Sequence, residues 1–198
     1  MYRFFKRVFD VISSLVALAI FSPIFIFISV WILIDSPGGV FYKQIRVGKN
    51  RKEFGLLKFR SMRPDSDRSG QLTIGNDSRV TKVGKFIRKF KLDEVPQLIN
   101  ILKGEMSVVG PRPEVPKYVN LYINEQLHVL DVLPGLTDYA SIEYLDEQKV
   151  LGASDDPEET YIKEVMPAKL ALNLKYIQDR NFWLDIKLIL KTISLILK

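Results

Sequence analysis

The chain has 198 residues, of which 47% are hydrophobic and 26% charged, and its formal net charge is +6. It contains no cysteine, which excludes disulfides, thiolate nucleophiles and cysteine zinc sites, and its single histidine argues against a histidine-ligated metal cluster. Acid–base or nucleophilic chemistry must therefore rest on carboxylates, lysines or hydroxyls. The positive charge favours an anionic partner: nucleic acid, lipid headgroups or a phosphorylated substrate.

The first predicted element is an apolar segment, residues 11–34, which contains no charged side chain. A helix of this length is about 36 Å long, enough to cross a bilayer. Basic residues lie on both sides of the segment, so the positive-inside rule does not distinguish its two ends. Ser22-Pro23 lies at its centre, where proline kinks a helix and the Ser22 hydroxyl can bond a freed carbonyl.

Three interpretations of this segment stay open at this stage. One is an ordinary transmembrane helix, which the length favours. Another is a signal peptide, since Ala17-Leu18-Ala19 resembles a cleavage site, but the apolar run continues well past it. The third is a re-entrant helix that enters the membrane, breaks at Ser22-Pro23 and returns to the same face. That topology agrees with both the basic flanks and the central proline.

The remaining elements are predicted from local patterns. Residues 40–47 and 53–62 flank the basic sequence GKNRK, which predicts a β-hairpin with a basic loop. Residues 64–79 are polar and turn-rich and predict a mobile loop. Residues 82–90 predict a short basic helix, either solvated or lying on a membrane with Phe86, Ile87 and Phe90 inserted. Residues 168–198 predict one amphipathic helix or a pair, with Phe182-Trp183 suited to an interface.

Two adjacent carboxylates, Asp93 and Glu94, precede an apolar helical pattern. The local pattern favours capping, with Asp93 as the N-cap and Pro96 in the first turn. The same position suits phosphate chemistry, because a helix N-terminus attracts phosphate and two carboxylates offer hard oxygen ligands to Mg²⁺. Arg88 and Arg112 lie on either side and can clamp phosphate oxygens. Capping does not require these arginines, so the pattern as a whole favours phosphoryl transfer.

Three stretches together carry a family resemblance: FYKQIRVGKNRKEFGLLKFRSM (41–62), NDSRVTKVGKFIRKFKLDEVPQLINILKGEMSVVGPRPE (76–114) and LPGLTDYAS (133–141). The chain resembles the bacterial sugar transferase family, the small monotopic phosphoglycosyl transferases. The resemblance covers nearly the whole chain, and its block from Arg88 to Arg112 is long and specific. It implies an α/β fold, mainly helical with a small β-hairpin. Residues 1–36 would form a re-entrant membrane helix-break-helix and residues 37–198 a cytoplasmic catalytic domain with membrane-interface helices.

The resemblance also implies an activity. A UDP-sugar would donate its sugar-1-phosphate to a polyprenyl phosphate, with release of UMP, at the cytoplasmic face of the bacterial inner membrane. Asp93 would be the nucleophile, forming a phosphosugar-aspartyl intermediate, and Glu94 together with Asp93 would hold Mg²⁺. Lys58, Arg88 and Arg112 would contact phosphates. The expected partners are the UDP-sugar, the polyprenyl phosphate and membrane lipids, with no nucleic acid; a homo-oligomer is compatible with the sequence.

Two positions depart from the family pattern, and two other functions compete. Asp138 stands where many members have glycine, and this difference bears on which sugar the enzyme accepts. Asn173 stands where many members have an acid, so the extra carboxylate role of that position is in doubt for this chain.

One competing function is a membrane-anchored, metal-dependent glycosyltransferase or phosphodiesterase that uses Asp93 and Glu94 only as metal ligands. The other is a non-enzymatic basic scaffold, although no nucleic-acid motif is present.

Overall fold

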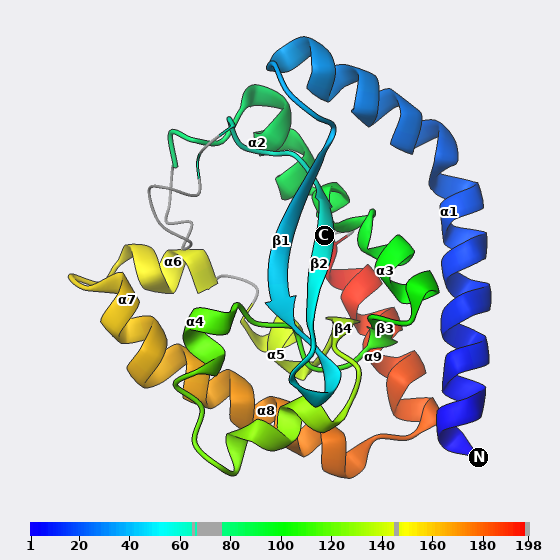
Figure 1. Ribbon diagram of the computed structural model, residues 1–198, viewed down its shortest axis with the longest axis vertical. Helices are drawn as coiled ribbons and strands as arrows, with labels where there is room; N and C mark the ends of the chain where they lie inside the picture. Colours follow the sequence, from blue (N-terminus) through cyan, green and yellow to red (C-terminus); the bar gives the residue numbers. More distant parts are fainter. Residues whose placement is uncertain (65, 67–76, 145–146, 197–198) are drawn as a thin grey trace.

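The computed structural model describes residues 1–64, 66, 77–144 and 147–196, and it is mainly helical with two small sheets (Figure 1). The predicted loop 64–79 therefore lies mostly outside the described residues. The helices are α1 (Tyr2–Asp35), α2 (Lys82–Lys89), α3 (Gln97–Lys103), α4 (Pro116–Val119), α5 (Tyr139–Glu143), α6 (Glu147–Gly152), α7 (Pro157–Thr160), α8 (Met166–Asp179) and α9 (Phe182–Ile196). The strands are β1 (Phe41–Val47), β2 (Glu53–Phe59), β3 (Ser107–Val109) and β4 (Gly135–Thr137).

The apolar segment forms one long helix, α1, which bends partway along (Figure 1). Pro23 lies inside it, so the structure has one continuous helix where we predicted two helices separated by a break. The Ser22 hydroxyl donates to the Ala19 carbonyl over 2.8 Å. That carbonyl is the acceptor that the missing Pro23 N–H would have used, which explains why the helix continues. Among the described residues, only α1 is long and apolar enough to cross a membrane.

Both ends of α1 are bonded to the same folded body. Near its start, Lys6 Nζ lies 2.7 Å from Asp185 Oδ2, and the Tyr2 hydroxyl donates to the same oxygen over 2.8 Å. At its end, Asp35 accepts a hydrogen bond from the Val83 N–H, and the buried Arg60 guanidinium donates to the Ser36 carbonyl over 2.7 Å. The two ends are thus held by α9 on one side and by α2 and β2 on the other.

The predicted β-hairpin is confirmed: β1 and β2 pair antiparallel, from Phe41 opposite Phe59 to Val47 opposite Glu53. Asn100 of α3 fixes the hairpin to the helices, because its side chain bonds the Leu57 N–H over 3.0 Å and the Gly55 carbonyl over 2.9 Å. The helix ends at Gly104, in the left-handed conformation common at helix ends. This connection holds β2 against the segment that carries the acidic pair.

The C-terminal half builds the second sheet and most of the remaining core. Strands β3 and β4 pair parallel, with Ser107 opposite Gly135. The predicted C-terminal amphipathic region is a pair of helices, α8 and α9. Trp183, at the start of α9, is exposed, as an interfacial position requires. Phe86 of α2 and Phe90, which follows the helix, are exposed, but Ile87 is fully buried against α1. Ile87 therefore packs inward rather than inserting into a membrane as we allowed.

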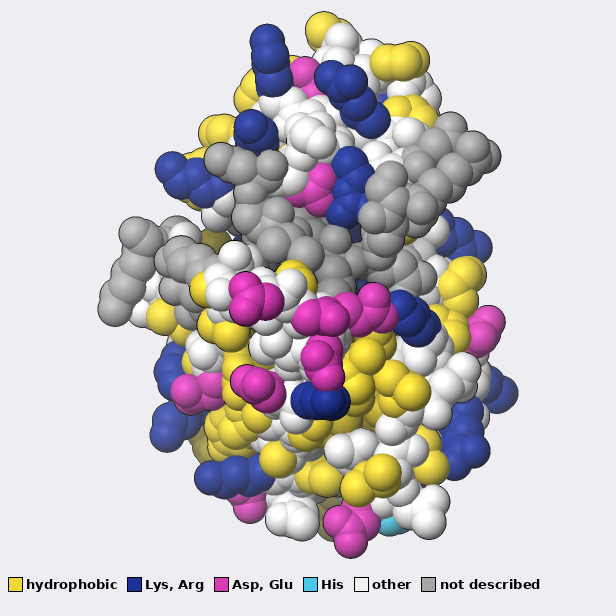
Figure 2. All heavy atoms as spheres, turned by 90° about the vertical axis from the view of Figure 1, so that its left-hand side faces the viewer, with side chains coloured by type: hydrophobic (Ala, Val, Ile, Leu, Met, Phe, Trp, Pro, Cys, Tyr) yellow, Lys and Arg dark blue, Asp and Glu magenta, His cyan; other side chains and the backbone are white. Residues whose placement is uncertain are grey.

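The exposed acids of α6 and α7 and the exposed apolar side chains of α1 lie on different sides of the molecule (Figure 1). Figure 2 shows the left-hand side of Figure 1, where acidic side chains gather over α6 and α7. The exposed acids of this segment are Asp155, Asp156, Glu158 and Glu159. On the opposite side, α1 exposes a row of large apolar side chains: Phe4, Phe5, Val8, Ile12, Leu15, Val16, Ile20, Phe21, Ile24, Ile26, Phe27, Val30, Leu33 and Ile34.

Candidate active site

The acidic pair lies in a short 3₁₀ turn, Leu92–Glu94, between α2 and α3. Lys91, just before it, adopts a left-handed conformation (φ 55°), which turns the chain sharply after α2. Helix α3 begins at Gln97, with Pro96 at its N-cap and no side-chain cap, so the prediction that Asp93 caps this helix is wrong. A cap at Asp93 would accept from the N–H two or three residues on, and Pro96 has no N–H to give.

Glu94 is held by two cations from distant parts of the chain. Arg112 forms two hydrogen bonds to its carboxylate, one of them Nη1 to Oε2 at 3.3 Å, and Lys58 of β2 lies 3.3 Å from Oε1. Burial opposes ionisation of Glu94, but the charges of Arg112 and Lys58 outweigh it and hold its pKa well below the usual range. Burial lowers the pKa of Lys58, whereas the Glu94 charge raises that of Arg112. Glu94 is therefore ionised, and the positive charges of Arg112 and Lys58 compensate its negative charge.

Asp93 lies in a different environment although it is the next residue. It is 7% exposed, and none of the described residues gives its carboxylate a hydrogen bond or ion pair. Burial raises its pKa, with the charge of Glu94 acting in the same direction and those of Lys58 and Arg88 opposing it. Burial thus favours the neutral form of Asp93, and the charges of Lys58 and Arg88 are what favours its ionised form.

Arg88, in the last turn of α2, completes the cationic surroundings. Its Nε donates to the Ser61 hydroxyl over 2.8 Å, and its pKa is lowered by burial and raised by the charge of Asp93. The structure thus brings together all five predicted site residues, Lys58, Arg88, Asp93, Glu94 and Arg112, from β2, α2, the acidic turn and the turn after β3. Ser22 and Pro23 lie in α1 and have no contact role at this site.

Asp138 and Ser61 support the site through hydrogen bonds that we did not predict from the sequence. Asp138, which is 0% exposed, accepts hydrogen bonds from the Arg112 N–H over 3.1 Å and from the Ser141 N–H over 2.6 Å. It therefore anchors the backbone of Arg112 and caps α5, and it is too enclosed to meet a sugar directly. The sequence TDYAS indicates that Asp138 could cap a helix, but no local pattern indicates its hydrogen bond to the Arg112 N–H. Ser61, bonded to Arg88, carried no local signal.

The turn that presents Arg112 is also fixed from its other side. Glu114 bonds Arg46 of β1 at 2.9 Å and the hydroxyl of Tyr161. Asn173 of α8 is buried beside this turn and lines a small cavity with Arg112; its Oδ1 has no partner among the described residues. These contacts leave Arg112 little backbone freedom, which suits a residue that must hold an anion in a defined place.

Asp93 and Glu94 are the acidic side chains of the site that could bind a metal ion. Among the described residues, no three acidic, histidine or cysteine side chains are arranged so that they could hold a metal ion. Of the five site residues, Asp93 and Glu94 can offer carboxylate oxygens, and those of Glu94 are engaged by cations. Mg²⁺ is commonly bound by one or two carboxylates together with substrate phosphates and waters. Asp93 and Glu94 therefore fit the carboxylate part of such a site.

The whole chain, residues 1–198, matches a family model described as bacterial sugar transferase. It is 38% identical to the UDP-N-acetylgalactosamine-undecaprenyl-phosphate N-acetylgalactosaminephosphotransferase of Aeromonas hydrophila, over 99% of this chain and 44% of that protein. It is 37% identical to the exopolysaccharide production protein ExoY of Rhizobium meliloti (strain 1021), over 95% and 83%.

A third relative is the UDP-glucose:undecaprenyl-phosphate glucose-1-phosphate transferase of Caulobacter vibrioides, 34% identical over 97% of this chain and 69% of that protein. The chain thus spans less than half the length of the Aeromonas relative but most of the Rhizobium one.

Proposed function

Because the chain belongs to the bacterial sugar transferase family, we propose that it moves a sugar-1-phosphate from a UDP-sugar to a polyprenyl phosphate, such as undecaprenyl phosphate, and releases UMP. This would be the first membrane step of bacterial glycoconjugate assembly. The observation that carries the proposal is the Asp93 carboxylate, buried beside three cationic side chains and without a hydrogen bond among the described residues. A structural carboxylate in that position would be paired, as Glu94 is.

The chemistry follows from these positions. Asp93 Oδ attacks the β-phosphorus of the UDP-sugar, and the bond from that phosphorus to the bridging oxygen breaks, so UMP leaves with the bridging oxygen and its electron pair. A phosphosugar-aspartyl intermediate remains. A polyprenyl phosphate oxygen then attacks the same phosphorus and releases the Asp93 carboxylate. Lys58, Arg88 and Arg112 stabilise charge on the phosphate oxygens during both displacements.

Mg²⁺ is the proposed cofactor, held by Glu94, with Asp93, and by donor phosphate oxygens. When bound, it would neutralise charge developing on the leaving phosphate. The chain's own part is to keep Glu94 ionised with Arg112 and Lys58 and to leave the Asp93 carboxylate without a hydrogen bond from the described residues, so that it can attack phosphorus. Because Glu94 bonds both cations here, binding of a diphosphate would exchange these ion pairs for phosphate contacts. Adjacent carboxylates thereby take separate roles.

We also propose that α1 is re-entrant, with both ends at the cytoplasmic face of the inner membrane. The support is that its two ends are bonded to one body, which a simple span would place on opposite sides of the bilayer. The ring of Phe182 packs on Phe9 near one end, and that of Phe86 on Trp31 near the other. The acidic face over α6 and α7 lies away from α1, which suits contact with anionic lipid on the α1 side.

A trapping experiment tests the proposed function. Detergent-solubilised protein is incubated with a panel of UDP-sugars without polyprenyl phosphate, quenched, digested and analysed by mass spectrometry. We expect at most about one equivalent of UMP and a sugar-phosphate adduct on the peptide that contains Asp93. Asp93→Asn should remove both, whereas the matched substitution Asp131→Asn, at an exposed carboxylate outside the site, should change neither.

The opposite outcome would favour the competing enzyme. If no adduct forms and UMP appears only when both substrates are present, the polyprenyl phosphate attacks directly and Asp93 acts as a metal ligand or base. If no UDP-sugar is turned over with polyprenyl phosphate present, the transferase proposal fails as a whole.

A further inference from the structure

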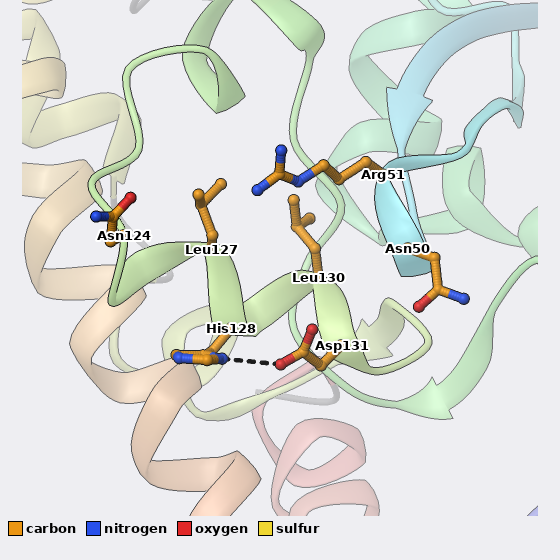
Figure 3. Close-up of a pocket in the computed structure, with 7 residues that line it drawn as sticks. All are labelled: Asn50, Arg51, Asn124, Leu127, His128, Leu130 and Asp131. Carbon is orange, nitrogen blue, oxygen red and sulfur yellow. Dashed lines mark hydrogen bonds and ion pairs between the residues drawn. The ribbon is translucent and has the colours of Figure 1, made fainter.

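A second hollow lies at the tip of the β1–β2 hairpin, apart from the acidic pair (Figure 3). Its volume is about 480 Å³, within the range of small-molecule sites. It lies between the hairpin tip, Lys49–Arg51, and the 3₁₀ turn Gln126–Asp131. The lining residues are Asn50, Arg51, Asn124, Leu127, His128, Leu130 and Asp131. None of the five site residues is among them, so this hollow is separate from the acidic pair.

The backbone of the hairpin tip is unusual at Arg51. Asn50 and Arg51 both have positive φ, 56° and 60°, and the Lys52 N–H bonds the Lys49 carbonyl, as in a type I′ turn. The second central position of such a turn strongly prefers glycine, because a side chain crowds the backbone in the left-handed region. Asn50 tolerates this conformation, whereas an arginine gains nothing from it. An arginine held in a glycine position points to a use for its side chain.

The Arg51 side chain extends over the hollow. In Figure 3 it extends from the hairpin above Leu127 and Leu130, with the Asn124 amide on the far side. None of the described residues forms a hydrogen bond or ion pair with it, whereas His128 and Asp131 at the rim bond each other at 2.9 Å. Leu130 is 7% exposed and forms an apolar floor. The hollow therefore offers a free guanidinium, an amide and an apolar surface.

We propose that this hollow binds the oxyanion of a small ligand, a phosphate monoester or a carboxylate, through Arg51. A guanidinium donates two parallel hydrogen bonds to either group, which a lysine would not match. Lys49 and Lys52, the first and last residues of the same turn, add positive charge near Arg51. The Asn124 amide and the leucine floor contact the rest of the ligand. This binding is independent of the transferase chemistry.

His128 makes the test direct, because it is the chain's only histidine and lies on the rim of the hollow. Full-length protein in nonionic detergent is labelled at the histidine ring carbons, and the one imidazole NMR signal is followed at constant pH. Sodium phosphate and sodium acetate are titrated separately, with sodium chloride at equal ionic strength as the reference. We expect a saturable shift with at least one oxyanion beyond the chloride effect. The phosphate and acetate titrations tell a phosphate-bearing from a carboxylate-bearing ligand.

Two variants show whether the shift reports Arg51. Arg51→Gly should weaken the oxyanion affinity about tenfold or more, whereas Lys52→Ala, which removes one neighbouring charge, should change it less than about threefold. Arg51→Gly should also raise the melting temperature by about 2–4 °C, since glycine fits the turn, and leave transferase turnover unchanged. The proposal is overturned if chloride reproduces the shifts or if Arg51→Gly titrates like wild type. A lower melting temperature in Arg51→Gly would equally remove its basis.

Discussion

The pKa values of the neighbouring carboxylates Asp93 and Glu94 are shifted in opposite directions. Glu94 is bonded to Arg112 and Lys58, and its pKa lies well below the usual range, whereas burial raises the pKa of Asp93. Pairs of titratable groups whose environments separate their pKa values frequently divide a reaction between them. Here Glu94, which is paired with cations, suits the binding of a metal ion, and Asp93, which has no hydrogen bond from the described residues, suits attack on phosphorus.

The raised pKa of Asp93 predicts how activity and stability depend on pH. Because the carboxylate must be ionised to attack, turnover should fall as pH decreases through a value above the ordinary aspartate pKa. A native pKa above the unfolded one means that the folded state binds this proton more tightly. Its contribution to stability is therefore present at low pH and is lost as pH rises through the native pKa.

Asp93→Asn should consequently be inactive yet at least as stable as wild type at pH 7, because it removes a buried charge. Chemical denaturation of the two proteins at pH 7 measures this. A free energy of unfolding lowered by more than about 1 kcal/mol would show that Asp93 is a structural group after all.

Chelation examines the role assigned to Glu94. If Mg²⁺ is held there with donor phosphates, EDTA should abolish turnover and added Mg²⁺ should restore it, while Glu94→Gln should be nearly inactive even at high Mg²⁺. UMP release is the measurement, and circular dichroism controls for unfolding, because Gln leaves Lys58 and Arg112 without a counter-charge. Full activity in chelator, or a requirement for Zn²⁺, would contradict the assignment.

At the scale of elements, short-range sequence patterns predicted strands and helices, because these depend mainly on neighbouring residues. The two stretches that flank GKNRK predicted the β-hairpin, and the amphipathic tail predicted one helix or a pair, of which the structure has the pair α8–α9. The cap at Asp93 was wrong because Pro96 removes a donor that the cap needs. The ion pairs of Glu94 join residues 36 and 18 positions apart, and no local pattern specifies such contacts. The local pattern had grouped Arg112 with the acidic pair, whereas only the family resemblance added Lys58 before the structure did.

The Asp138 anchor gives a prediction at this scale. Asp138→Ala removes the acceptor for the Arg112 N–H and the cap of α5, which should lower the free energy of unfolding by about 1–2 kcal/mol. Because Arg112 is then less well placed, the KM for the UDP-sugar should rise more than the melting temperature alone explains. Asp138→Asn, which can keep one of the two bonds, should fall in between. Equal kinetics in all three proteins would limit Asp138 to a purely structural role.

At the scale of the whole molecule, the fixed ends of α1 conflict with a simple membrane span. Tyr2 and Lys6 bond Asp185, and Asp35 bonds α2, so the folded body holds both ends of a 34-residue helix. Breaking these contacts would expose Asp185, which is 3% exposed and also bonded by the hydroxyl of Tyr176. Losing such a partner set from a buried charge is costly. The body therefore opposes any topology that separates the two ends.

Cysteine labelling tests this topology without background, because the chain has no cysteine. A cysteine placed beside Met1 and another replacing Lys43 should both be labelled only from the cytoplasmic side. Pro23→Leu should straighten α1 and raise the fraction in which the N-terminal cysteine is reached from the opposite side, because leucine restores the N–H bond that Pro23 lacks. Adding Asp185→Ala should raise that fraction further, because Tyr2 and Lys6 lose their acceptor, whereas Asp131→Ala should not. Opposite-side labelling in the wild-type protein itself would mean that α1 spans the bilayer and that its N-terminal contacts are not formed in the membrane.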